Sequence, residues 1–255
     1  MKHLQTSLRW GTEMLREERK RIIAGKLDLD YKEISVRAVV DFIKVNLNDF
    51  AVQYSHIEHE NSLTQKLVTL LMQRLPQPAL FYFHSQYLEN IDSGNSSSVD
   101  IGVLSSVEKV IQVETIKYNH DEAFFKIEAK RLDSSIEKRR EKEYVVGHDE
   151  NKKYKNSGGI ERFKKKKHGD SLNFAAMIGY MQTDTFSIWL NKVNGWIDEQ
   201  IAAPSSTDLK WDVQDKLVKQ NESDMWSEYT SKHSRLKSDD IILFHLWVNL
   251  TIINK

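Results

Sequence analysis

The chain has 255 residues, of which 40% are hydrophobic and 29% are charged, a composition typical of a soluble globular protein. It contains no cysteine, which excludes disulfides, zinc–thiolate sites, iron–sulfur clusters and thiol nucleophiles. With 37 basic and 37 acidic residues the formal net charge is zero, so the whole-chain balance does not indicate a polyanionic partner. No apolar run has the length of a membrane span or of a signal peptide. We therefore expect a cytoplasmic protein with no membrane partner.

The first part of the chain predicts helices that pack on the rest. Apolar residues recur irregularly from Leu4 to Ile23, and at helical spacing from Val39 to Leu47, where Ser35 is a candidate N-cap. A third helix is predicted to start at the capping box Ser62-Leu63-Thr64-Gln65 and to end at Pro76.

The middle of the chain predicts strands of a sheet, with Ser134 to Glu143 as a further helical segment and Asp149 to Gly159 as a mobile loop. The expected strands are Ala79 to Tyr87, Val99 to Leu104, Val110 to Lys117 and Phe124 to Leu132, the last two joined by a turn. Later, Phe174 to Gln182 is apolar, Ile188 to Ile201 has a helical apolar stripe, and Ile241 to Leu250 is typical of a buried central strand. His245, inside that last strand, reads as a core histidine.

Ionised residues occupy strand positions where a core strand should have none. In the segment from Phe124 to Leu132, alternation places Glu128 and Lys130 on one strand face, and Asp100 can reach that face from the neighbouring strand. Two carboxylates at the rim of a sheet form a hard, oxygen-rich site suited to Mg²⁺ or Mn²⁺. A lysine beside them can orient an attacking water, so the pattern predicts a metal-dependent phosphodiesterase.

The same residues resemble the signature of the PD-(D/E)XK, or restriction-endonuclease-like, superfamily: an Asp followed later by Glu-x-Lys. Here the signature reads Asp100, then Glu128-Ala129-Lys130. The longer stretch Ile127-Glu128-Ala129-Lys130-Arg131-Leu132, followed by Gly158-Gly159-Ile160-Glu161-Arg162-Phe163 and Met177-Ile178-Gly179-Tyr180, is similar to a poorly characterised bacterial branch of that superfamily.

The resemblance extends over roughly residues 57 to 190 and implies a fold and an activity. It implies an α/β fold with a restriction-endonuclease-like core, a central mixed β-sheet flanked by helices, and extra N-terminal helices. We expect one nuclease-like domain over residues 1–255, with 1–55 as a helical extension and 56–255 as the core. The implied activity is hydrolysis of phosphodiester bonds of nucleic acid, with DNA as the expected substrate, dependent on Mg²⁺ or Mn²⁺, in bacterial restriction or defence.

The resemblance also suggests further metal ligands beside Asp100 and Glu128. These are the carbonyl of Ala129 and an acidic residue of the preceding helix, for which Glu60 is the candidate. Glu60 lies on the inward face of that helix if the helix extends backward, whereas a cap at Ser62 leaves Glu60 outside the helix.

A local excess of positive charge follows the carboxylates. From Lys126 to His168 there are fifteen basic and eight acidic residues, a distribution suited to a phosphate backbone, although a solvated charged face has the same composition. The candidate nucleic-acid contacts are Arg162, Lys164, Lys165, Lys166 and Lys167.

Two other functions are compatible with the sequence. In one, the same fold is a non-catalytic nucleic-acid-binding module whose acidic cluster is structural. In the other, the chain is a protein-interaction subunit of a restriction or defence complex. Cleavage of both strands of a duplex would imply a homodimer. The candidate protein partners are therefore a second copy of the chain or a partner protein of a defence system.

Overall fold

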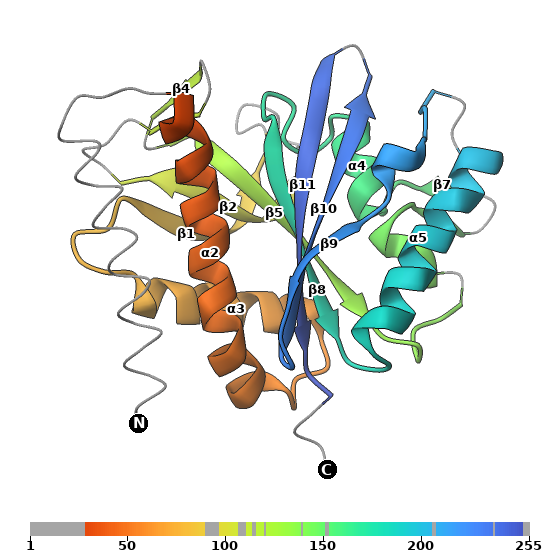
Figure 1. Ribbon diagram of the computed structural model, residues 1–255, viewed down its shortest axis with the longest axis horizontal. Coiled ribbons are helices and arrows are strands. Elements are labelled where there is room, and N and C mark those ends of the chain that lie inside the picture. The colour runs from red at the N-terminus through yellow and green to blue at the C-terminus, as the bar shows by residue number, and fades with distance from the viewer. Residues whose placement is uncertain are drawn as a thin grey trace.

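The computed structural model describes residues 29–89, 97–106, 111–113, 116–119, 121–138, 140–150, 153–205, 208–236 and 238–251. The helix expected from Leu4 to Ile23 lies outside these residues. The central feature is a twisted seven-stranded sheet, which runs from β1 at the left of Figure 1 to the strands that cross at its centre. Its strands, in spatial order, are β1 (Phe81–Leu88), β2 (Ser98–Ser105), β5 (Ala123–Leu132), β8 (Phe174–Met181), β11 (Ser238–Asn249), β10 (Trp226–Arg235) and β9 (Val218–Glu222).

The sheet is mixed. β5, β8 and β11 run parallel to one another, whereas β1–β2, β2–β5, β11–β10 and β10–β9 are antiparallel pairs. Every residue of β8 is buried, as expected for a parallel strand covered on both faces. The expectation of a buried central strand at 241–250 is confirmed by β11, which lies between β8 and β10. The burial of the apolar run from Phe174 is confirmed by β8, and the α/β class is confirmed as well.

Helices cover both faces of the sheet (Figure 1). α2 (Leu29–Tyr54) and α3 (Glu60–Arg74) lie on one face, and α4 (Gly159–Lys164) and α5 (Phe186–Ala202) lie on the other. The strands contribute alternate side chains to the two cores. In β8, Ile178 and Tyr180 pack toward α2 and α3, whereas Met177 and Met181 pack toward α5.

Two helix starts differ from the sequence prediction. α2 begins at Leu29, so Ser35 lies inside the helix and is not its N-cap. α3 begins at Glu60 after the N-cap residue His59, which makes no side-chain capping hydrogen bond. The predicted start at Ser62 is therefore wrong, because contacts of the first turn with the sheet replace a local cap.

Three segments between the main strands also differ. The single strand expected from 110 to 117 is two short strands, β3 (Ile111–Val113) and β4 (Ile116–Tyr118), which pair with each other. Turns and irregular backbone occupy 134–138 and 140, where a helical segment was expected, and η1 (Glu141–Tyr144) is a 3₁₀ helix. The expected mobile loop contains an antiparallel pair, β6 (His148–Glu150) and β7 (Lys153–Lys155). These elements have three or four residues each, too few for a periodic pattern to identify them.

One more short helix, η2 (Val213–Asp215), precedes β9 and begins with a capping box at Asp212. Among the described residues, none of the helices has the length and apolar character needed to cross a lipid bilayer.

Candidate functional site

The site is built on one face of β5. Lys126, Glu128 and Lys130 point to the side of the sheet that α4 covers, while the apolar residues between them pack on the opposite side. Glu128 is 1% exposed and Lys130 is 9% exposed. The predicted placement of Glu128 and Lys130 on one strand face is therefore confirmed, and both side chains are buried.

Asp100 joins these residues where the pairing of β2 with β5 stops. The last paired residues are Ile101, which follows Asp100, and Ile127, which precedes Glu128. Beyond them, Oδ2 of Asp100 accepts the backbone N–H of Ala129 at 2.7 Å, so a side chain takes the place of the strand carbonyl. The end of the ladder thus brings the Asp100 carboxylate beside Glu128, as the sequence predicted.

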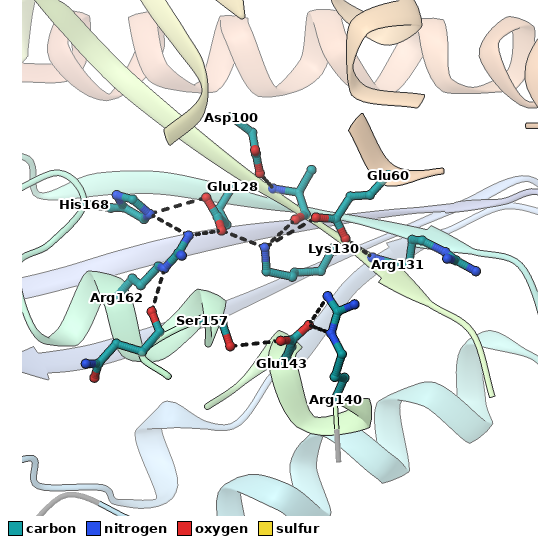
Figure 2. Close-up of polar contacts among 12 residues, drawn as sticks. Glu60, Asp100, Glu128, Lys130, Arg131, Arg140, Glu143, Ser157, Arg162 and His168 are labelled. Carbon is teal, nitrogen blue, oxygen red and sulfur yellow. Dashed lines mark hydrogen bonds and ion pairs between the residues drawn. The ribbon is translucent and has the colours of Figure 1, made fainter. Parts of the chain in front are cut away.

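Glu60 reaches the same place from the first turn of α3. Its Oε2 accepts the backbone N–H of Arg131 at 2.9 Å, and its Oε1 lies 3.6 Å from Nζ of Lys130. The helix start at Glu60 makes these contacts possible. Of the acidic residues suggested by the sequence, all three therefore meet at one end of β5 (Figure 2).

The ammonium of Lys130 lies among the oxygen atoms that were predicted to hold a metal. Its Nζ is 2.7 Å from Oε1 of Glu128, 3.0 Å from the carbonyl oxygen of Ala129 and 3.6 Å from Oε1 of Glu60 (Figure 2). Burial disfavours the charge, but the surrounding carboxylates, Glu128 foremost, outweigh it and raise the pKa of Lys130 above the usual lysine value. Lys130 is therefore a fixed cation at neutral pH.

Glu128 has more partners on one oxygen than on the other. Oε1 accepts from Lys130 and, at 2.8 Å, from Nη1 of Arg162. Oε2 is buried and has no hydrogen-bond partner among the described residues, with Nε2 of His168 at 3.4 Å. Although burial raises the pKa of Glu128, the positive charges led by Lys130 lower it more, so the carboxylate stays ionised.

Asp100 has the opposite electrostatic balance. Burial and repulsion from Glu128 raise the pKa of Asp100 to about 7, against the weaker opposing effects of Lys130 and the Ala129 N–H. Because burial is the largest cause of this shift, Asp100 holds a proton more readily than an exposed aspartate does.

Two site residues were not found from the sequence. His168 is fully buried between two acids, with Nδ1 at 3.2 Å from Oε1 of Glu89, and its Nε2 is 3.2 Å from Nη1 of Arg162. Glu89 also pairs with Lys126, the first charged residue on this face of β5. Glu89 lies two residues after the predicted strand from Ala79 to Tyr87, which was the signal in the sequence. Nothing in the sequence marked His168.

The predicted nucleic-acid contacts Arg162 and Lys164 point into the protein. Arg162 binds Glu128 and also donates from Nε to the carbonyl of Asn156 at 3.0 Å. The Lys164 side chain has no exposed surface, and its Nζ binds Oδ1 of Asp215 at 2.6 Å. The expectation of a phosphate contact at Lys164 is therefore corrected, because a fully buried ammonium is closed to a surface ligand.

The three lysines that follow are closer to the surface. Nζ of Lys165 lies 2.7 Å from Glu161, and Nζ of Lys166 lies 2.6 Å from Asp170. Lys167 is exposed. Only the last of the five therefore presents an exposed side chain, although Arg162, Lys165 and Lys166 remain partly accessible.

Two polar cavities flank the cluster. The larger, of about 590 Å³, has Glu60, Lys130, Arg131, Arg140, Glu143 and Asn61 in its wall. A smaller one, of about 160 Å³, is lined by Asp100 together with Asn61, Gln65 and Gln86. Lys130 and Asp100 thus face solvent on two sides of the first turn of α3.

A metal ion needs oxygen ligands that are free to turn toward it. Among the described residues no group of three or more acidic or histidine side chains is arranged as a metal site, and the Lys130 ammonium lies among the oxygens of Glu128, Ala129 and Glu60. By its chemistry the donor set fits Mg²⁺ or Mn²⁺, because carboxylate and carbonyl oxygens are the ligands that these ions prefer. The Oε2 of Glu128 is buried without a hydrogen bond, so it is the donor atom least engaged by the protein.

Comparisons of the chain with protein-family models, with curated proteins and with solved structures found no match. The chemistry of the site therefore has to be argued from its own residues.

Proposed function

We propose that this chain is a divalent-metal-dependent nuclease that hydrolyses phosphodiester bonds of nucleic acid, with DNA as the expected substrate. The observation that carries the proposal is the meeting of Asp100, Glu128 and Lys130 where the β2–β5 ladder ends, next to solvent-filled cavities. Closely placed carboxylates with a lysine are a recurring means of binding a metal ion and a phosphate together.

The architecture supports the same proposal. A mixed sheet with helices on both faces is what the resemblance to the PD-(D/E)XK superfamily implies, and the sheet described above is of this kind. A restriction-endonuclease-like core, and a role in bacterial restriction or defence, are parts of this proposal.

The residues that would hold Mg²⁺ or Mn²⁺ are Asp100, Glu128, Glu60 and the carbonyl of Ala129. When bound, the ion would supply charge neutralisation at the phosphate and activation of water. Lys130 adds a permanent positive charge that can hydrogen-bond a phosphate or water oxygen, and its strand fixes its position. The N–H of Ala129 keeps the Asp100 carboxylate in place.

One observation favours a second function, the non-catalytic nucleic-acid-binding module. Lys130 and Arg162 already pair with Oε1 of Glu128, which is how a structural ion cluster would be neutralised. In that case the carboxylates would stabilise the fold, and no divalent ion would bind.

The test is cleavage of plasmid and single-stranded DNA in Mg²⁺ or Mn²⁺ by the intact chain and by Asp100→Asn, Glu128→Gln and Lys130→Met. We expect each substitution to lower the rate on the order of a hundredfold or more, and chelator to abolish cleavage. The matched control is Glu222→Gln on the exposed edge strand β9, which should leave the rate unchanged.

Binding of Mn²⁺ is measured alongside by calorimetry. Cleavage that survives in all three variants would contradict the proposal. An intact chain that neither cuts nor binds a divalent ion, but still binds DNA, would support the binding module instead.

A further inference from the structure

An arginine that the sequence did not single out lies at the mouth of the larger cavity. Arg140 is in the wall of the 590 Å³ cleft that also contains Lys130 and Glu60. Its side chain is 51% exposed, compared with 11% for Lys130. Lys130 therefore lies deep in the cleft, and Arg140 lies nearer to its opening.

The guanidinium of Arg140 is held in one orientation from behind. Nε and Nη2 both donate to Oε2 of Glu143, at 3.0 and 2.8 Å (Figure 2). Oε1 of Glu143 in turn accepts from Oγ of Ser157 at 2.9 Å and lies 2.8 Å from Nδ1 of His148. The acid is thus fixed by three neighbours before any ligand arrives.

This arrangement differs from an ordinary surface ion pair. In such a pair both side chains are mobile and solvated, whereas the Glu143 side chain is only 11% exposed. Burial raises the pKa of Glu143, but the hydrogen bonds from Arg140 and Ser157 lower the pKa by more than burial raises it. The Glu143 carboxylate therefore stays ionised and keeps Arg140 in place. An arginine fixed in this way loses little side-chain entropy when it binds an anion.

The cleft also has the dimensions for a nucleotide unit. Its volume is in the range of cavities that enclose one small ligand. Its wall contains three cations, Lys130, Arg131 and Arg140, and three carboxylates, Glu60, Glu137 and Glu143. Glu60 and Glu143 already accept hydrogen bonds from the protein, and Glu137 also interacts within it. The half-exposed guanidinium of Arg140 is therefore the group at the rim that we expect to receive an incoming phosphate.

We propose that Arg140 binds the phosphate next to the scissile one, on a nucleic-acid strand that enters the cleft past this arginine and reaches Lys130. The assignment rests on the proposed nuclease function. It places the scissile phosphate beside Lys130 in the deep part of the cleft. The neighbouring phosphate lies beside the more exposed Arg140 at the rim. Glu143, Ser157 and His148 are positioning residues that act through Arg140.

The test measures binding without cleavage. A fluorescent single-stranded oligonucleotide is titrated with the intact chain and with Arg140→Gln and Arg140→Lys in chelator, at several salt concentrations, by fluorescence anisotropy. We expect Arg140→Gln to weaken binding roughly tenfold and to lower the slope of log K against log salt by about 0.7, the value for one lost phosphate contact on a single strand. Arg140→Lys should keep the slope and lose part of the affinity.

The chain offers a matched control in Arg37 on α2. Arg37 is likewise half exposed, at 41%, and likewise backed by a buried acid, Glu228. It lies on the helix layer across the sheet from α4, so Arg37→Gln should leave both affinity and slope unchanged. Thermal unfolding of each variant confirms that the comparison is between folded proteins.

Each outcome has one meaning. Salt-dependent binding by the intact chain that Arg140→Gln leaves unchanged overturns the assignment of Arg140 but not the nuclease. An equal loss in Arg37→Gln also overturns it, because the effect would then be one of general charge. An intact chain that binds no oligonucleotide at any salt concentration overturns both this inference and the proposed function.

Discussion

Two buried polar clusters lie on the α4 side of the sheet, and they differ in how completely their hydrogen bonds are satisfied. One is the site around Glu128. The other is a row of hydrogen-bonded side chains that crosses the core under α4 and α5. Its members, in order of contact, are Trp247, Tyr144, His245, Ser231, His233, Asp215 and Lys164.

The directions of the bonds in the second cluster follow from its two ends, given that both histidine rings are neutral and Asp215 is ionised. The indole of Trp247 can only donate, and it donates to the Tyr144 hydroxyl at 2.8 Å. Because Nδ1 of His233 must donate to Asp215, the Tyr144 hydroxyl must donate to Nδ1 of His245 at 2.9 Å. Nε2 of His245 then carries the proton and donates to Ser231 at 2.7 Å. Ser231 donates to Nε2 of His233 at 2.6 Å.

The row ends on a carboxylate. Nδ1 of His233 donates to Oδ1 of Asp215 at 2.5 Å, and Nζ of Lys164 donates to the same oxygen at 2.6 Å. The other oxygen accepts the backbone N–H of Asp212. Burial lowers the pKa of both His233 and His245, which keeps the rings neutral, as the direction of the bonds requires.

The comparison favours the first cluster as the candidate site. Asp215, His233 and Ser231 follow the order of a hydrolase triad, but Ser231 is 5% exposed and its oxygen already accepts from His245. The first cluster has a buried carboxylate oxygen without a hydrogen bond and an acid with a pKa of about 7, beside open cavities. Incomplete hydrogen bonding next to open cavities, rather than the types of residue, distinguishes the candidate site from the structural cluster.

The largest effect is expected from breaking the complete cluster. Lys164→Ala leaves the buried Asp215 carboxylate without its cation, so the free energy of unfolding should fall by about 3–5 kcal/mol. Urea denaturation measures the loss. The neighbouring Lys165→Ala is the control and should lose much less, because Lys165 is partly exposed. Equal losses in the two variants would contradict the comparison.

The free energy of unfolding should depend on pH through Asp100, which belongs to the cluster around Glu128. Because the folded pKa of Asp100, about 7, is above the unfolded value, the folded state binds more protons between pH 4 and 7. Stability from this group is therefore fully present below about pH 4 and is lost as the pH rises through 7, with a slope of at most about 1.4 kcal/mol per pH unit.

The measurement is the free energy of unfolding of the intact chain and of Asp100→Asn, in chelator, from pH 4 to 8. We expect the difference between the two to narrow and then reverse in favour of the variant as the pH rises. A difference that does not change with pH would show that Asp100 is ionised throughout this range.

A smaller effect is expected in metal affinity. The Lys130 ammonium lies among the oxygens of Glu128, Ala129 and Glu60, so Lys130→Met should bind Mn²⁺ more tightly than the intact chain, by roughly tenfold. Calorimetry measures the affinity. Lys126→Met, on the same strand face but paired with Glu89, is the control, and tighter binding in both variants would rule out a specific competition.

The smallest effect is expected at the surface. Lys166 pairs with Asp170, whose side chain is 70% exposed, so Lys166→Ala should change the free energy of unfolding by less than about 0.5 kcal/mol. Urea denaturation of Lys166→Ala and Lys164→Ala compares an exposed with a buried lysine only two residues apart in the sequence. A loss of several kcal/mol at Lys166 would mean that burial does not set the difference.

The sequence predicted those parts of the molecule whose signal is local. Alternation along β5 was enough to place Glu128 and Lys130 on one face, and the apolar run from Ile241 to Leu250 identified β11. His245 is a satisfied core histidine, as expected. These features depend on the period of a strand, which is written in neighbouring residues.

The remaining features depend on distant partners. Four consecutive lysines predict a solvated segment, yet Lys164 is buried because Asp215, 51 residues later, lies beneath it. The start of α3 at Glu60 is stabilised by the backbone of β5 rather than by a local cap. No periodic pattern encodes such contacts, because they form only when the layers pack.

Helix α4 also gives the site a natural optical probe. The helix has six residues, and its Arg162 contacts Glu128 while its Lys164 lies over the ring of Trp211, with Nζ 4.7 Å from the ring centre. The emission of an indole depends on charges close to it. A ligand that draws Arg162 away from Glu128 and shifts α4 with it would change the charge beside Trp211, and with it the tryptophan fluorescence of the protein, with no label attached.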